Sequence, residues 1–131
     1  MKKHTPLEHD IQSVFFSWLD AYGVMRWSRF VVGGKFQAFA VPNDGKRSIG
    51  AAMWHKGQGL RAGVPDVFIP IPSINYHGLF IEFKRDEKSR VTIAQKEWIR
   101  QLQDCCYCVR VCRSVDEAVN VVTAYMEGRE P

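Results

Sequence analysis

Two acidic residues and a lysine stand beside two short apolar runs in the middle of the chain. Asp66 follows a proline and precedes the run 67–70, and the next apolar run ends with Glu82, Phe83 and Lys84. Runs of this length are typical of buried strands, and residues two apart in a strand share a face. Glu82 and Lys84 should therefore point the same way, with Phe83 directed into the core. If the two runs pair as a hairpin, Asp66 lies beside Glu82.

Two carboxylates and an ammonium group at neighbouring strand ends suit the hydrolysis of a phosphodiester. Such a substrate is an anion, so hydroxide must be generated at neutral pH and delivered against negative charge. A carboxylate-bound Mg²⁺ or Mn²⁺ acidifies its water and neutralises the phosphoryl oxygens. We expect Asp66, Glu82 and the backbone carbonyl of Phe83 to be ligands, and Lys84 to orient the water or stabilise the phosphorane. The alternative is an exposed Glu82–Lys84 ion pair on an edge strand, which stabilises little.

The N-terminal segment predicts a helix that brings a third acid towards these groups. Thr5 and Pro6 suit the N-cap and first helical position, and Glu8 would complete a capping box. A helical apolar stripe follows, which Gly23 should end. Glu8 and Gln12 lie one turn apart beside that stripe. Glu8 is therefore either a capping residue or an acid that overhangs the site.

The next segment predicts β-structure followed by a basic region. Residues 24–32 and 36–41 have strand-like composition, and a Gly-Gly pair between them indicates a hairpin. A turn follows, then a short helix over 48–56 and a glycine-rich loop that leads towards Asp66.

Positive charge is concentrated in this part of the sequence. Between Arg26 and Arg61 there are seven basic residues and one acid, Asp44. Lys46, Arg47 and Arg61 are the candidates for contacts with a phosphate backbone. The alternative is a solvated face that has no partner.

The C-terminal third predicts helix, strand and helix. Residues 85–90 form a charged loop that we expect to be mobile. Thr92 and Gln95 form a second capping box at the start of a helix, a strand follows over 107–112, and a third capping box at Ser114 opens the last helix. Together the elements predict an α/β fold with a small mixed sheet flanked by helices. The acids, the lysine and Gln95 should meet at one end of that sheet.

Length and composition predict one globular domain over residues 1–131. The chain is 46% hydrophobic and 24% charged, with a net charge of +4. Residues 1–64 hold nine Lys or Arg against four Asp or Glu (9 − 4 = +5), and residues 65–131 hold nine against ten (9 − 10 = −1). A basic half beside an acid-bearing half favours a polyanionic partner, most simply nucleic acid, although scattered surface lysines remain an alternative.

No apolar stretch approaches the length of a membrane span or a secretion signal, so we expect a cytoplasmic protein. The four cysteines lie between Cys105 and Cys112. We interpret them as buried, reduced thiols rather than a zinc site.

The motif residues carry a family resemblance once their spacing is considered together. Alone, E-x-K is weak, but Pro-Asp before one apolar run and E-x-K after another, sixteen residues on (82 − 66), is more specific. This pattern resembles the PD-(D/E)xK nuclease signature. The wider pattern resembles the VRR-NUC family, in particular its small stand-alone phage and bacterial members. The segments that carry this resemblance are Glu8 with Gln12, Val41-Pro42-Asn43, Gly63-Val64-Pro65-Asp66, Gln95 with Trp98 and Leu102, and 109–125.

The resemblance implies a restriction-endonuclease-like core and a metal-dependent DNA endonuclease. Stand-alone members are similar to Holliday junction resolvases, which act as homodimers on four-way junctions. By position, Asp66 and Glu82 would bind the metal, Lys84 would be the catalytic lysine, Glu8 an additional acid and Gln95 a polar contact. Two alternatives stay open: a monomeric nuclease acting on flaps or single-strand ends, and a nucleic-acid binding module that does not cut. The segment 33–37 is longer than the resemblance leads us to expect, which leaves the register of the preceding segment open.

Overall fold

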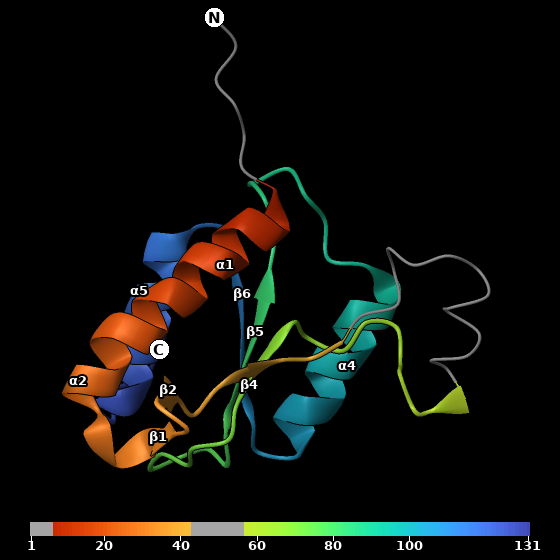
Figure 1. Ribbon diagram of the computed structural model, residues 1–131. Coiled ribbons are helices and arrows are strands. Elements are labelled where there is room, and N and C mark those ends of the chain that lie inside the picture. Colours follow the sequence, from red (N-terminus) through yellow and green to blue (C-terminus); the bar gives the residue numbers. More distant parts are fainter. Residues whose placement is uncertain (1–6, 43–56) are drawn as a thin grey trace, which may run out of the picture.

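The computed structural model describes residues 7–42 and 57–131. A four-stranded sheet with the order β3-β4-β5-β6 forms its centre (Figure 1). Strands β3 (Phe39–Ala40), β4 (Val67–Ile69) and β5 (Leu79–Phe83) are antiparallel to one another, and β6 (Cys108–Cys112) runs parallel to β5. The small mixed sheet and the central β4–β5 hairpin predicted from the apolar runs are confirmed.

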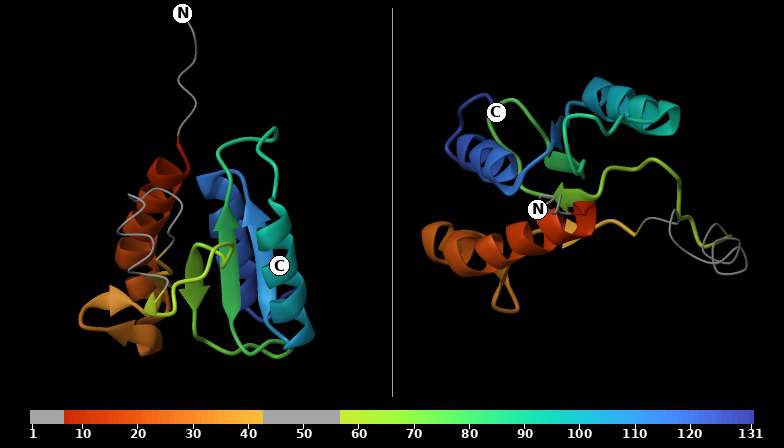
Figure 2. Two further views of the ribbon diagram at one scale, coloured as in Figure 1. Left: turned by 90° about the vertical axis from the view of Figure 1, so that its right-hand side faces the viewer. Right: turned by 90° about the horizontal axis from the view of Figure 1, so that it is seen from above.

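Helices cover both faces of this sheet (Figure 2). On one face lie α1 (Glu8–Trp18) and α5 (Val115–Met126), and on the other lies α4 (Ile93–Asp104). The hydrophobic core fills the space between the sheet and the α1–α5 pair. Its fully buried members include Phe15 of α1, Leu19 directly after α1, Ile81 and Phe83 of β5, and Tyr125 of α5. Each such side chain contributes about 1.5–3 kcal/mol by its burial.

The chain after α1 stays helical where the sequence predicted a strand. A π-helical turn (Leu19–Gly23) and α2 (Val24–Arg26) continue α1, and a 3₁₀ turn (Ser28–Phe30) follows after Trp27. The prediction that the helix ends at Gly23 is therefore wrong, as is the strand over residues 24–30. Tertiary packing explains the difference, because Val24 and Phe30 contact the core from helical turns and Trp27 contacts it from the residue between them.

The predicted Gly-Gly hairpin is confirmed but short. β1 (Val31–Val32) pairs with β2 (Lys35–Phe36) across the two glycines, both of which have positive φ. The predicted strand over 36–41 is divided, since β2 ends at Phe36 and β3 joins the main sheet instead. The helix predicted over 48–56 lies outside the described residues.

The helix starts agree with the sequence in two of three cases. Thr92 caps α4 with Gln95 in a reciprocal box, and the Ser114 hydroxyl accepts from a backbone N–H of α5. In contrast, α1 begins at Glu8 with Leu7 as its N-cap, and the Asp10 carboxylate accepts from the Leu7 N–H at 3.1 Å. Thr5 and Pro6 lie outside the described residues, but the N-cap at Leu7 makes Glu8 the first helical residue, so the capping-box interpretation of Glu8 is wrong.

The C-terminal tail packs against the sheet, and two of the four cysteines differ from expectation. Arg110 donates to the Glu130 carboxylate at 2.8 Å and to the Pro131 carbonyl at 3.2 Å, so the tail is held against β6. Cys108 and Cys112 are buried as expected, whereas the other two cysteines are exposed. Within the described ranges, no helix has the length and apolar character needed to cross a membrane.

A glycine allows the segment that leads into β4 to pack closely against the start of α4. Gly63 has φ +89°, and a Cβ built there would lie 2.7 Å from the carbonyl carbon of Ala94. Only glycine fits both the left-handed backbone and this close approach. Gly63 thereby fixes the path of the chain three residues before Asp66.

We predict that Gly63→Ala destabilises the protein more than Gly59→Ala. Gly59 also has a positive φ (+93°), but a Cβ there meets nothing within 4 Å. Gly59→Ala should cost about 1–2 kcal/mol from backbone strain alone. Gly63→Ala should add about 1–3 kcal/mol from the steric clash. Urea denaturation of both variants measures the difference, and equal losses would contradict the packing described here.

Candidate active site

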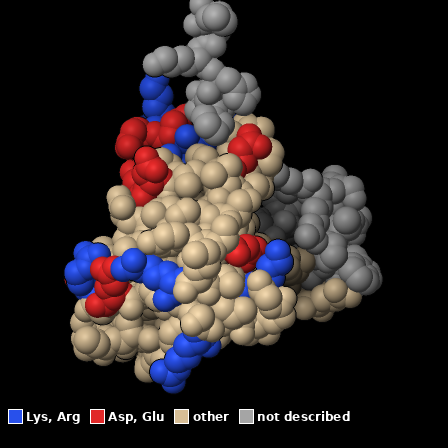
Figure 3. Space-filling view, turned by 60° about the vertical axis from the view of Figure 1, so that its left-hand side comes forward, with Lys and Arg blue, Asp and Glu red and all other residues tan. Residues whose placement is uncertain are grey.

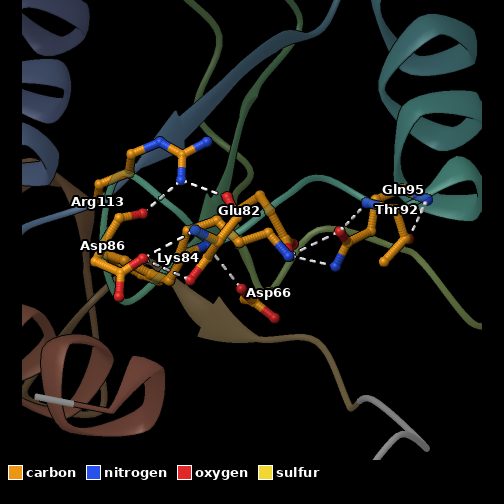
Figure 4. Close-up of polar contacts among 9 residues, drawn as sticks. Asp66, Glu82, Lys84, Asp86, Thr92, Gln95 and Arg113 are labelled. Carbon is orange, nitrogen blue, oxygen red and sulfur yellow. Dashed lines mark hydrogen bonds and ion pairs between the residues drawn. The ribbon is translucent and has the colours of Figure 1, made fainter.

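Four predicted site residues from three parts of the fold converge at one end of the sheet (Figure 4). Asp66 precedes β4, Glu82 lies in β5, Lys84 follows β5, and Gln95 lies in the first turn of α4. Because Val67 pairs with Ile81, the antiparallel register continues to place Asp66 opposite Glu82. The Asp66 Oδ2 accepts a hydrogen bond of 2.7 Å from the N–H of Phe83, which fixes the carboxylate against β5.

Glu82 is a buried carboxylate that is only half satisfied. Its side chain is 2% exposed. Its Oε1 accepts from Gln95 Nε2 at 2.6 Å and lies 3.6 Å from Lys84 Nζ. Its Oε2 is buried and has no hydrogen-bond partner among the described residues. Burying an ionised carboxylate oxygen without a donor is costly, and either a proton or a cation on Glu82 would remove this cost.

The structure excludes the exposed edge-strand ion pair as the explanation for Glu82 and Lys84. β5 is an inner strand between β4 and β6, and the Lys84 side chain is only 7% exposed. The Lys84 N–H donates to the Cys112 carbonyl at 2.9 Å and extends the β5–β6 pairing. Its ammonium group donates to Gln95 Oε1 at 2.8 Å.

Gln95 links the acid to the lysine and is itself held by the helix cap. Its amide donates to Glu82 through Nε2, while Oε1 accepts from Lys84 Nζ and from the Thr92 N–H at 2.9 Å. The Thr92 hydroxyl accepts in turn from the Gln95 N–H at 3.2 Å. The capping box that starts α4 therefore also sets the orientation of a site residue.

While no cation is bound, the surroundings of the site raise the pKa of both carboxyl groups. Burial and the nearby Asp66 carboxylate raise the pKa of Glu82 to about 8, against the opposing effect of Lys84. Burial also raises the pKa of Asp66, although the Phe83 N–H opposes that shift. The two carboxyl groups are close enough to share a hydrogen bond when one of them is protonated.

Glu8 lies near the pair without joining it. Its charge contributes to raising the pKa of both Asp66 and Glu82. Glu8 is the first residue of α1, is partly exposed, and makes no hydrogen bond to either carboxylate in the described part of the chain. The position agrees with an acid that overhangs the site at a distance.

The donor set suits a hard divalent cation. The carboxylates of Asp66 and Glu82 provide negative charge. The buried Oε2 of Glu82 also has a lone pair that can accept either a proton or a cation. The described residues contain no group of three or more His, Cys, Asp or Glu that could hold a metal ion. Mg²⁺ needs no such group, because it is commonly bound by one or two carboxylates and completes its shell with water and substrate oxygens. Asp66 and Glu82 therefore fit Mg²⁺ or Mn²⁺.

Sequence reasoning missed the residue that braces the loop between Lys84 and α4. One Arg113 nitrogen, Nη1, donates to the carbonyls of Asp86 and Ser89, each at 2.6 Å (Figure 4). The Asp86 carboxylate also accepts from the N–H groups of Lys88 and Ser89. The loop predicted to be mobile is therefore held in place. No local pattern reveals this brace, because Arg113 is more than twenty residues away in the sequence.

The predicted phosphate contacts are only partly described. Arg61 is exposed in the segment leading to Gly63, and its guanidinium donates to the Leu60 carbonyl at 3.2 Å. Lys46 and Arg47 lie outside the described residues.

Comparison with known proteins agrees with the fold. Residues 7–116 match the VRR-NUC domain family. A solved structure described as "VRR_NUC domain protein" is similar over 97% of this chain and 93% of its own, with a TM-score of 0.76 and 28% sequence identity. A search of curated proteins found no match.

We predict that the metal-free protein loses stability as the pH rises, and that Glu82 causes much of this loss. The unfolded chain ionises Glu82 near its usual pKa of 4.5, whereas the folded protein retains the proton up to about pH 8. Between these values the unfolded state binds fewer protons, so the stability conferred by protonated Glu82 declines by about 1.4 kcal/mol per pH unit. Urea unfolding in EDTA at pH 5.5 and 7.5 should show roughly 2–3 kcal/mol more loss for wild type than for Glu82→Gln.

The control is Glu97→Gln, which neutralises an exposed acid on α4. It should keep the wild-type pH dependence. If Glu82→Gln also follows the wild-type curve, Glu82 does not hold a raised pKa in the folded protein.

Proposed function

The chain belongs to the VRR-NUC family, and on this premise we propose that it is a metal-dependent, structure-specific DNA endonuclease. A VRR-NUC domain implies a nuclease-type function. The observation that carries the proposal is the half-satisfied, buried Glu82 carboxylate beside Asp66, with the Lys84 ammonium group 3.6 Å from it.

Each residue of the site has a role in this proposal. Asp66 and Glu82 hold Mg²⁺ or Mn²⁺, with the backbone carbonyl of Phe83 as a further ligand. When bound, the cation lowers the pKa of a coordinated water and neutralises charge on the phosphodiester. Lys84 orients the attacking water or stabilises the negative charge of the pentacovalent phosphorane. Gln95 keeps the lysine and Glu82 in fixed relative positions.

The buried site argues against a module that binds nucleic acid without cutting it. A phosphate-binding protein gains nothing from two acids that face a phosphate, because their charge repels it. The burial of Glu82 and the raised pKa of about 8 also cost stability at neutral pH. A catalytic cation bound by Asp66 and Glu82 would account for the presence of two buried carboxyl groups at this position.

The preferred substrate in this proposal is a four-way DNA junction, cut by a homodimer. Two copies related by a two-fold axis present two equivalent sites, which matches two equivalent strands of a junction. Glu8 supplies additional negative charge near the metal, and Lys46, Arg47 and Arg61 contact the DNA backbone. The protein would act in the cytoplasm of a bacterial or phage-infected cell. A monomeric nuclease acting on flaps or single-strand ends uses the same site and is the second candidate.

One experiment separates these possibilities. Four-way junction, flap and linear duplex substrates are incubated side by side with Mg²⁺, Mn²⁺ or EDTA, and the mass of the protein in solution is measured by sedimentation. Symmetric junction cuts by a dimer support the first proposal. Flap cutting by a monomer supports the second. Binding without cleavage under both metals would contradict nuclease function.

We predict that Glu82→Gln and Lys84→Ala each reduce the cleavage rate at least 100-fold while leaving junction binding largely intact, since both groups act on the reacting centre. Cleavage under single-turnover conditions measures the rate, and gel shifts in EDTA measure binding. Matched controls are Glu97→Gln and Lys35→Ala, which change the same charges on exposed surface. Cleavage at the wild-type rate by either site variant would show that its residue has been assigned wrongly.

A further inference from the structure

The basic side chains of the protein divide into neutralised and unneutralised groups. Most Lys and Arg side chains in residues 7–42 and 57–131 form ion pairs with Asp or Glu. On the face shown in Figure 3, most Lys and Arg atoms accordingly lie against Asp or Glu atoms. Of the others, Arg29 lies over the Phe30 ring and Arg61 donates to the Leu60 carbonyl.

Three cations remain, and they lie close together in the sequence. The side chains of Lys88, Arg90 and Lys96 are exposed and make no ion pair, hydrogen bond or ring contact with any described residue. All three fall within the loop after β5 and the first turn of α4. The acids of the same loop are already engaged: the Asp86 carboxylate accepts backbone and hydroxyl donors, and Glu87 lies 4.0 Å from Arg113.

The loop that carries these cations is held in a defined shape. Arg113 donates to the carbonyls on either side of Lys88, at Asp86 and Ser89, and the Asp86 carboxylate accepts from the Lys88 and Ser89 N–H groups. Ordering a loop on binding costs free energy, so a loop that is already ordered presents its charges at lower cost. Arg113 therefore acts as a brace for the positively charged loop.

The same loop forms one border of the candidate active site. It leaves β5 directly after Lys84 and enters α4 at Ile93, two residues before Gln95 (Figure 1). Lys96 follows Gln95 in the first turn of α4. Lys96 is thus the direct chain neighbour of the residue whose side chain contacts Glu82.

We propose that Lys88, Arg90 and Lys96 form a phosphate-binding rim that grips the DNA backbone next to the bond being cut. The inference rests on the proposed nuclease function, which determines the partner: a polyanion whose phosphates must come within reach of Lys84. Backbone contacts of this type position a nucleic acid without reading its sequence. The rim thus adds a second set of backbone contacts to the one expected at Lys46, Arg47 and Arg61.

The test compares the salt dependence of DNA binding in two triple variants of the full chain. One carries Lys88→Gln, Arg90→Gln and Lys96→Gln. The matched control carries Arg29→Gln, Lys35→Gln and Arg129→Gln, which removes the same net charge from exposed positions outside the loop after β5 and outside α4. Binding to a fluorescent four-way junction and to a linear duplex is measured in EDTA from 50 to 200 mM salt, after thermal unfolding has confirmed that both variants fold.

The rim variant should bind both DNAs at least tenfold more weakly, and the slope of log K against log salt should fall by about 2–3, because each lost phosphate contact removes close to one unit. The control should keep a slope near that of the wild type. Equal slopes for the two variants would contradict the proposal that Lys88, Arg90 and Lys96 bind DNA. An acidic protein partner would then be the alternative ligand for these cations. Metal-dependent cleavage by the wild type is scored separately, so loss of the rim hypothesis leaves the nuclease proposal intact.

Discussion

A buried carboxylate with one oxygen held and the other unsatisfied is the constraint on which this structure depends. Glu82 lies on the inner strand of the sheet, where an ionised side chain loses most of its hydration. Gln95 and Lys84 stabilise Oε1, but no described group donates to Oε2. Burial, together with the nearby Asp66 charge, therefore raises the pKa of Glu82 to about 8, and a bound proton relieves the charge in the metal-free state. A divalent cation relieves it better, because it serves both carboxylates at once.

The rest of the fold can be understood as the means of holding this group. The β4–β5 register sets Asp66 opposite Glu82, and the Phe83 N–H fixes the aspartate in place. Gly63 lets the segment before Asp66 pass against α4. The first turn of α4 then supplies Gln95, whose amide spans the acid and the lysine. The helix cap of α4, the β4–β5 hairpin and the close contact at Gly63 thus together fix the positions of Asp66, Glu82 and Gln95.

The sequence predicted the parts of this arrangement that depend on local pattern. The two short apolar runs located β4 and β5, and capping chemistry located α4 and Gln95. It failed where tertiary packing decides the structure. Residues 24–30 have strand-like composition, yet Val24 and Phe30 contact the core from helical turns. The brace from Arg113 to the loop joins residues distant in sequence, so no spacing rule reveals it. The buried state of Lys84 likewise became visible only when β5 proved to be an inner strand.

The central claim is that Asp66 and Glu82 together coordinate one cation through carboxylate oxygens. A crystal soaked in Mn²⁺ and measured at the manganese absorption edge tests it directly, because the anomalous signal locates the ion without reference to activity. The account predicts a single strong peak within about 2.0–2.4 Å of a carboxylate oxygen from each residue. The peak should be absent from Glu82→Gln crystals treated in the same way. A peak elsewhere on the protein, or none at millimolar Mn²⁺, would contradict the account.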